Sequence, residues 1–181
     1  MALLIYGVFN GNKVTGLALK VAVGVLLLTA AIMFGFAPNA LSYSFGNMLV
    51  HDSYALFFKA LILTGSVGAL AISRRYLEYA NISRFEYPVL VLLATLGMFI
   101  MVSANSMLSL YMGLELQSLS LYILAAIQRD NARSSEAGLK YFVLGALSSG
   151  MLLFGISLIY GYTGALDFDS IAVAASGLDK V

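Results

Sequence analysis

Long apolar runs alternate with short polar connections along this chain. A helix that crosses a bilayer needs about 20 mostly apolar residues. Five runs are therefore predicted to be transmembrane helices, at residues 15–36, 53–73, 87–102, 107–127 and 137–162. The apolar residues 1–9 are too few to span and are interpreted as the remnant of a first helix. The pattern predicts an all-α, polytopic transmembrane bundle in which residues 1–181 form one domain.

The connections between the runs differ in charge. Those at residues 10–15, 74–86 and 128–136 hold nearly all of the basic residues, which are Lys13, Arg74, Arg75, Arg84, Arg129 and Arg133. The connections at 39–52 and 103–106 and the tail from 163 have no Lys or Arg before Lys180. Because basic loops stay on the inner side of a membrane, the first set is predicted to be cytoplasmic, or on the matrix side in a mitochondrion.

Two of the connections carry further expectations. Residues 103–106 form a very short turn, so the spans on either side of it must pack as an antiparallel pair. Residues 39–50, which include Ser, Tyr, Asn and Gly, are expected to be a loop. The tail at 163–181, with Asp167, Asp169 and Asp179, is too short and too polar to span and is expected on the outer, periplasmic side.

Composition supports a membrane protein and narrows its chemistry. The chain is 61% hydrophobic and 10% charged, with a mean hydropathy of +0.92. A soluble domain carries about 25% charged residues, so this chain cannot cover a water-facing surface. It has no Cys and one His, which argues against Cys-ligated zinc, Fe–S clusters, disulfides and thiol catalysis. The net charge of +1 indicates no nucleic-acid partner.

Four charged residues lie inside predicted spans, and two of them, Lys20 and Lys59, are interpreted as snorkelling to the nearer membrane surface. The other two are Glu115 and Lys140. An isolated charge at membrane depth costs about 2.5–3.5 kcal/mol on insertion scales, so each is a functional-site hypothesis. Glu115 lies about 12 residues, or roughly 18 Å, from the cytoplasmic end of its span. Lys140 is only four or five residues into the next span, near a helix N-terminus, where a cation opposes the helix dipole. The offset of roughly 10 Å predicts no direct ion pair between them.

Polar residues follow both charges and could line a hydrated path. They are Gln117, Ser118 and Ser120 after Glu115, and Ser148 and Ser149 after Lys140. The alternative is a structural pair that only sets the register of the two helices. Against that alternative, Ser or Asn would set the register without an ionisable group.

The amino-acid sequences of the fourth and fifth spans resemble those of a known family. The segments are LGMFIMVSANSMLSLYMG, LYMGLELQSLSLYILAA (residues 110–126) and EAGLKYFVLGALSSGMLLFGISLIYGYTG (residues 136–164). They are similar to the antiporter-like membrane subunits of the proton-pumping NADH:quinone oxidoreductase, respiratory complex I. The similarity is strongest to the subunit N group, called subunit 2 in mitochondria, and is specific over residues 96–164.

This resemblance implies a fold of fourteen transmembrane helices in two inverted repeats, of which the chain would cover the N-terminal part. Glu115 stands at the family's proton-path glutamate and Lys140 at a lysine on the following helix. The family couples quinone reduction elsewhere in the complex to charge changes along the membrane arm. The resemblance implies no cofactor in this chain, with FMN, Fe–S clusters and quinone in other subunits.

The implied partners are the other membrane-arm subunits and the lipid bilayer, and the implied location is a bacterial or mitochondrial inner membrane. The sequence stops before the family's seventh helix and begins within its first, so a fragment is expected. Two other functions stay open: a subunit of a multi-subunit sodium/proton antiporter, and a truncated chain with only a structural role. Sodium-dependent activity without NADH would favour the antiporter, although the amino-acid sequence after Glu136 argues against this alternative.

Overall fold

A computed structural model describes residues 2–10, 15–35, 41–79, 82 and 84–177. Lys13, Asp179 and Lys180, which entered the predictions above, lie outside the described residues. The helices are α1 (Ala2–Asn10), α2 (Thr15–Gly35), α3 (Ser53–Tyr79), α4 (Glu86–Val102), α5 (Met107–Ala125), α6 (Ala132–Thr163) and α7 (Phe168–Ser176). A two-stranded hairpin, β1 (Ser42–Ser44) and β2 (Leu49–His51), separates α2 from α3.

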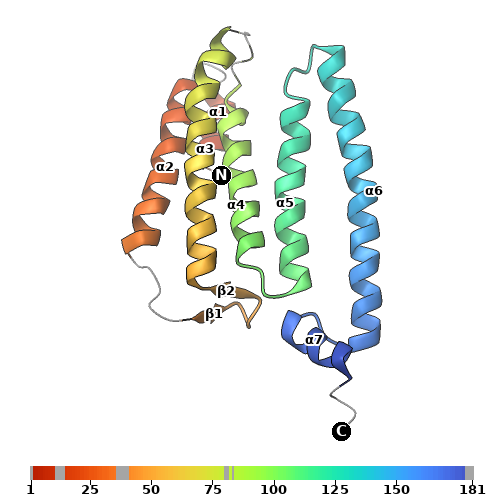
Figure 1. Cartoon of the computed structure of the whole chain (residues 1–181). Helices are drawn as coiled ribbons and strands as arrows, with labels where there is room; N and C mark the ends of the chain where they lie inside the picture. The colour runs from red at the N-terminus through yellow and green to blue at the C-terminus, as the bar shows by residue number, and fades with distance from the viewer. Residues whose placement is uncertain (1, 11–14, 36–40, 80–81, 83, 178–181) are drawn as a thin grey trace.

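The prediction of a mostly helical membrane bundle is confirmed. Four described helices, α2, α3, α5 and α6, are long and apolar enough to cross a membrane, whereas α4 is a shorter apolar helix of 17 residues. At 1.5 Å per residue α4 spans roughly 25 Å, slightly less than a typical hydrocarbon core. It nevertheless lies between α3 and α5 and runs alongside both (Figure 1).

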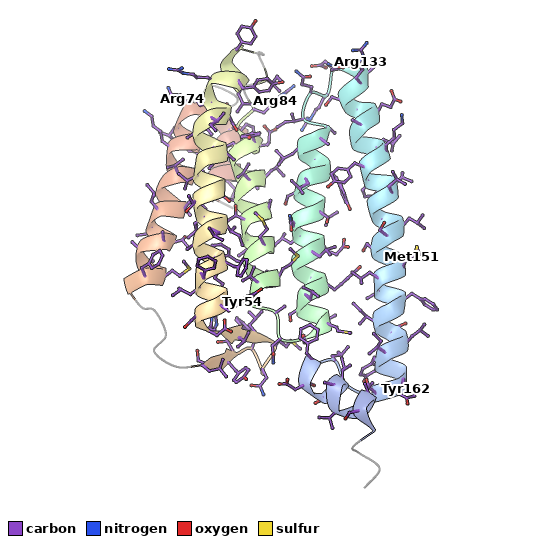
Figure 2. The ribbon with its side chains drawn as sticks, in the orientation of Figure 1. Tyr54, Arg74, Arg84, Arg133, Met151 and Tyr162 are labelled. Carbon is purple, nitrogen blue, oxygen red and sulfur yellow. The ribbon has the colours of Figure 1, made fainter. Side chains whose placement is uncertain are left out.

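The two ends of the bundle carry different chemistry. Arg74, Arg84 and Arg133 lie at one end, which we call the arginine end, whereas Tyr54 and Tyr162 lie at the other (Figure 2). The hairpin, the α4–α5 turn and α7 also lie at this second end, which we call the hairpin end (Figure 1). Alternate connections therefore fall at the same end, as the charge pattern predicts.

The expectation of a loop at residues 39–50 is wrong for part of that segment. β1 and β2 pair there as an antiparallel hairpin whose turn has positive φ at Phe45, Gly46 and Asn47. Two three-residue strands are not stable alone. The α4–α5 turn supplies the missing bonds: Val50 N–H donates to Ser103 O at 2.8 Å, and Asn105 N–H donates to Met48 O at 2.9 Å. The hairpin thus depends on a contact that is distant in sequence.

Two helices begin or end several residues away from their predicted limits. α3 continues to Tyr79, so Arg74 and Arg75 lie on its last turns instead of in a loop. α6 begins at Ala132, five residues earlier than predicted, because Asn131 accepts a hydrogen bond from Arg133 N–H at 3.0 Å and caps the helix. Polar caps and charged turns extend these helices beyond the apolar segments that hydropathy detects.

The predicted tail contains the short helix α7. Asp167 caps it by accepting a hydrogen bond from Ser170 N–H at 2.9 Å. The hydrogen bonds from Ser170 hold the pKa of the Asp167 carboxyl below its ordinary value. The backbone of this segment also joins the bundle, since Met107 N–H donates to Leu166 O at 2.9 Å. The tail is therefore attached to the start of α5.

The apolar core lies between α2 and α3 and is covered by α4. Its buried members are Leu19, Ala22, Leu26, Leu63 and Leu70. α5 then packs closely on α4, and α6 forms an outer edge in which only Gly138 and Ile156 are buried among the described residues. The core therefore lies away from the α5–α6 interface, where the predicted charges are found.

Candidate functional site

α5 presents two chemically different faces. Ser109, Gly113 and Ser120 are its buried residues, and Gly113 lies against the backbone of α4. Tyr111, Glu115 and Tyr122 are spaced by four and seven residues, which places them on one side of a helix. Each of these three contacts α6. The face toward α6 is thus the one that carries the ionisable side chains of α5.

Glu115 lies in the middle of α5. It is eight residues after Met107 and ten before Ala125, or roughly 12 and 15 Å from the two helix ends. Its half-buried carboxylate accepts a hydrogen bond from the Ser149 hydroxyl of α6. This bond joins the two helices at the depth where a charge is most costly.

A third group extends this contact. The Tyr111 hydroxyl lies 3.0 Å from Ser149 Oγ, so Tyr111, Ser149 and Glu115 form one hydrogen-bonded chain across the interface. Tyr111 was not among the site residues predicted from the sequence. The available signal was its spacing of four residues from Glu115, which puts both on one helix face.

Lys140 belongs to a different pair. Its Nζ lies 2.6 Å from Glu136 Oε1, one turn away on α6, and the two side chains are 69% and 62% exposed. Because α6 begins at Ala132, Lys140 is in its third turn and not near its N-terminus, so the prediction that Lys140 opposes the helix dipole is wrong. Lys140 also lies nine residues, roughly 13 Å, from Ser149 along α6. The prediction that Lys140 and Glu115 form no direct pair agrees with these separate partners.

The predicted lining residues do not share one surface. Ser149 is bonded to Glu115, and Ser118 is half-buried three residues after Glu115. Ser120 is buried and donates to Leu116 O at 2.8 Å, and the exposed Ser148 donates to Leu144 O at 3.0 Å, each within its own helix. The backbone of Gln117 faces Gly97 on α4. The structure thus brings only one of the five directly to the carboxylate.

A cavity of about 640 Å³ opens at the arginine end between α4, α5 and α6. Arg84, Glu86 and Arg129 line it, and Arg129 lies 3.8 Å from Glu86. Tyr122 and Phe142 line its apolar part, with their rings 5.9 Å apart and nearly perpendicular.

Tyr122 lies between this cavity and the level of Ser149. Its hydroxyl packs against Gly145, where a Cβ would collide with it, and Gly145 is one turn before Ser149 on α6. Among the residues of α5 that line the cavity, Tyr122 is thus the nearest in sequence to Glu115, which is not part of the lining.

The chemistry available at the interface is proton exchange. A carboxylate and two hydroxyls can donate and accept protons, and no cation among the described residues is bonded to Glu115. Within the described ranges, no three His, Cys, Asp or Glu side chains gather closely enough to hold a metal ion.

Comparisons with known proteins agree with the family resemblance found in the amino-acid sequence. A family model described as "NADH:quinone oxidoreductase/Mrp antiporter, TM" matches residues 104–180, which include α5 and α6. The chain is 54% identical over 178 residues to NADH-quinone oxidoreductase subunit N of Parvibaculum lavamentivorans, with 95% of this chain and 35% of that protein covered. It is 51% identical over 177 residues to the subunit N of Rhodospirillum rubrum, with 97% and 36% covered.

A comparison of folds agrees with these similarities. The structure of respiratory complex I from Thermus thermophilus with bound aureothin contains a chain that matches this one with a TM-score of 0.74 and 29% identity, covering 96% of this chain and 38% of that one. This chain therefore spans little more than a third of the length of the relatives it matches.

Proposed function

We propose, from the homology between this chain and NADH-quinone oxidoreductase subunit N, that it is part of a proton-translocating membrane-arm subunit of that complex. Glu115 would carry the proton. The observation that supports this role is a carboxylate in the middle of a membrane-spanning helix, held across the α5–α6 interface by one hydroxyl.

The bonding of Glu115 suits a group that changes its charge. An ionised carboxylate can accept about four hydrogen bonds, but Glu115 has one from another side chain. A carboxylate with a purely structural role inside a membrane would be expected to pair with a cation. A hydroxyl partner can donate to the ionised form and accept from the protonated form, so both charge states can be accommodated.

Lys140 would act as a relay toward the arginine end. Its Nζ lies 2.6 Å from Glu136 Oε1, one turn away on the same helix. Both side chains are more than half exposed on α6, so the ammonium can turn away from Glu136 without displacing buried side chains. Gln117, Ser118, Ser120 and Ser148 would contribute to water placement only after movement of the helices, since no bond joins them to Glu115 in this structure.

The homology also supports the wider assignment. In the proposal, α2 to α6 are five spans and α1 is the remnant of a first helix, in the first repeat of a fourteen-helix antiporter-like fold. FMN, Fe–S clusters and quinone would be bound by other subunits, in line with a sequence that has no Cys. The partners would be other membrane-arm subunits in an inner membrane, with the arginine end facing the cytoplasm or matrix.

A sodium/proton antiporter subunit is the second candidate, because the description of the matching family model names both kinds of protein. Relatives of about half identity that are named subunit N favour complex I. Peptide mapping of a native gel of gently solubilised membranes separates the two. Peptides of this chain in the band with NADH dehydrogenase activity support the proposal, whereas a small separate species would favour a structural role or an antiporter.

Glu115→Gln tests the role of the carboxylate. We expect turnover and proton pumping per assembled complex to fall roughly tenfold or more, since a proton-transferring side chain commonly contributes at least that much. Quinone reduction by NADH, a ΔpH-sensitive dye and a native gel would measure turnover, pumping and assembly in the same membranes. Asp169→Asn is the matched control, because Asp169 is an exposed carboxylate on α7. Normal pumping by a normally assembled Glu115→Gln complex would refute the proposed role.

A further inference from the structure

We propose that Tyr111 is a positioning residue for Glu115. Its hydroxyl sets the direction of the Ser149 O–H bond, so that the chain of three groups stabilises the ionised carboxylate and reverses when Glu115 takes up a proton. This inference rests on the proposed function of Glu115 and assigns the neighbouring groups through which the carboxylate exchanges its proton.

The direction of each hydrogen bond follows from the number of protons available. A serine hydroxyl has one proton. In the structure Ser149 donates it to Glu115 Oε1, so it has none left for Tyr111. The contact of 3.0 Å between Tyr111 Oη and Ser149 Oγ is then a bond in which tyrosine donates. Tyr111 thus holds the Ser149 oxygen from the far side and leaves its proton directed at the carboxylate.

Protonation of Glu115 requires the opposite arrangement. The new carboxyl O–H donates to Ser149 Oγ, and the Ser149 O–H turns to the Tyr111 oxygen. One sequence of transfers connects the two states: a proton binds the Tyr111 oxygen, the proton that Tyr111 held passes to Ser149, and the proton that Ser149 held passes to Glu115. Three O–H bonds form and three break: one for each of the two transfers within the chain, and one in the hydronium ion that gives its proton to Tyr111 and leaves as water. Both hydroxyls are neutral before and after.

The position of Tyr111 is fixed by the hairpin end of the bundle. Tyr111 lies one turn from Glu115 toward the N-terminus of α5. There Ser106 caps the helix by accepting from Ser109 N–H at 3.2 Å, and Ser109 Oγ donates to Met48 O of the hairpin at 2.8 Å. The first turn of α5 is therefore fixed to the hairpin, and the tyrosine on its second turn has little freedom to move away from Ser149. The chain of hydroxyls leads from Glu115 toward the hairpin end.

Other ionisable groups on the neighbouring helices have no bond to the Glu115 chain in the described part of the molecule. α4 carries Glu86 and Tyr87 in its first turn, at the arginine end. The groups on α6 are Arg133, Glu136, Lys140 and Tyr141 on the arginine half and Tyr160 and Tyr162 near the hairpin end, and the other group on α5 is Tyr122. A change in the pH dependence of activity after alteration of Tyr111 would therefore report on the three-membered chain.

The test compares Tyr111→Phe, Ser149→Ala and the double variant in the assembled complex, measured as quinone-reductase turnover against pH. Tyr111→Phe keeps the ring and removes the donor. We expect a turnover loss of about three- to tenfold and an acid limb that moves up by about half to one pH unit, because the ionised carboxylate loses an oriented hydrogen bond. Ser149→Ala should move the limb in the same direction and further.

The double variant separates positioning from packing. Because Tyr111 acts through Ser149, adding Tyr111→Phe to Ser149→Ala should cause no further loss. Tyr160→Phe is the matched control, since it removes the hydroxyl of an exposed tyrosine on the same helix as Ser149. Its pH profile should equal that of the unaltered complex.

The possible outcomes are distinguishable. If Tyr111→Phe keeps the unaltered pH profile, or if the two losses multiply in the double variant, the positioning role is overturned. A fall in the amount of complex with an unchanged profile per complex would show an interhelical contact only and would overturn it too. A functional Glu115→Gln complex would refute the proposed function itself, whereas an inactive Glu115→Gln complex with a Tyr111→Phe that resembles Tyr160→Phe would refute only this inference.

Discussion

α5 contacts α4 through backbone and contacts α6 through side chains. A Cβ added at Gly97 of α4 would lie 2.6 Å from the Gln117 nitrogen and 2.7 Å from the Gly113 oxygen. A Cβ at Gly113 would lie 2.8 Å from the Gly97 oxygen, so the exclusion is mutual. On the other side, Tyr122, Glu115 and Tyr111 reach α6 by their side chains.

The α4–α5 contact therefore has a structural role, whereas the α5–α6 contact holds the candidate functional site. Small residues let helices approach closely in a membrane, where packing and hydrogen bonds, not hydrophobic exclusion, hold helices together. A backbone contact has one arrangement, because neither partner can rotate away. A contact through hydroxyls can reverse its hydrogen bonds without moving the helices. The rigid α4–α5 contact thus fixes α5 in place, while the hydrogen bonds and the charge at the α5–α6 interface can change.

The largest effect is expected from adding a side chain at the close backbone contact between α4 and α5. Gly97→Ala would press a methyl group into the backbone of α5, which cannot yield, so we expect a loss of about 2 kcal/mol or more and little assembled complex. Gly150→Ala on α6 is the control, because no described atom outside the neighbouring backbone of α6 lies within 4 Å of its Cβ position. Thermal stability and the amount of complex on a native gel would be compared. Equal stability of the two variants would contradict the rigid contact.

A smaller effect is expected at the side-chain contact. Gly145→Ala would displace Tyr122, whose hydroxyl occupies the position of the added methyl group. Because a side chain can move where a backbone cannot, we expect a cost of about 1 kcal/mol.

A double variant tests this explanation of the Gly145→Ala cost. In a Tyr122→Ala background the cost of Gly145→Ala should largely disappear, since its partner has been removed. Thermal unfolding of the four complexes gives the coupling free energy, and a coupling near zero would show that Tyr122 is not the obstacle.

The smallest effect is expected at α7, whose N-terminus lies next to the start of α5. Asp167 caps α7 next to the start of α5, and Asp167→Ala should speed amide exchange in residues 168–176 without loss of the complex. Asp169→Asn, at an exposed position of the same helix, serves as the control. Similar exchange in both variants would show that the cap does not hold α7.

The same cap has an expected pH dependence. Hydrogen bonds lower the pKa of Asp167 in the folded chain, so the stabilisation is complete above the ordinary carboxyl pKa of about 3.9. It should be lost only as pH falls through the lower folded value. Exchange in residues 168–176 should therefore stay slow down to that ordinary pKa. An acceleration that is complete at pH 5 would contradict the assignment.

The membrane class, the positions of most helices and the candidate carboxylate could be predicted from sequence. Apolar runs of the right length need a bilayer or a protein interior, whatever their tertiary contacts, and the predicted span at 107–127 differs from α5 by two residues at one end. Glu115 was identifiable because a charge in such a run is costly wherever it points. Lys140 was identifiable for the same reason, but its partner Glu136 was assigned to a loop, since hydropathy does not detect the capped polar turn that begins α6.

Sequence by itself determined that this chain is a bundle of apolar helices with a carboxylate at mid-depth, because burial of apolar surface and the cost of a buried charge are local properties of the residues. Only the tertiary structure decided which residues meet that carboxylate. Ser149 and Ser148 are adjacent and chemically identical, yet one faces Glu115 and the other bonds within its own helix. The rotation of α6 against α5 makes that choice, in an arrangement where Gly138 lies against Ala126 and Gly145 lies against Tyr122. A hairpin of two three-residue strands likewise exists only because the α4–α5 turn completes its hydrogen bonds.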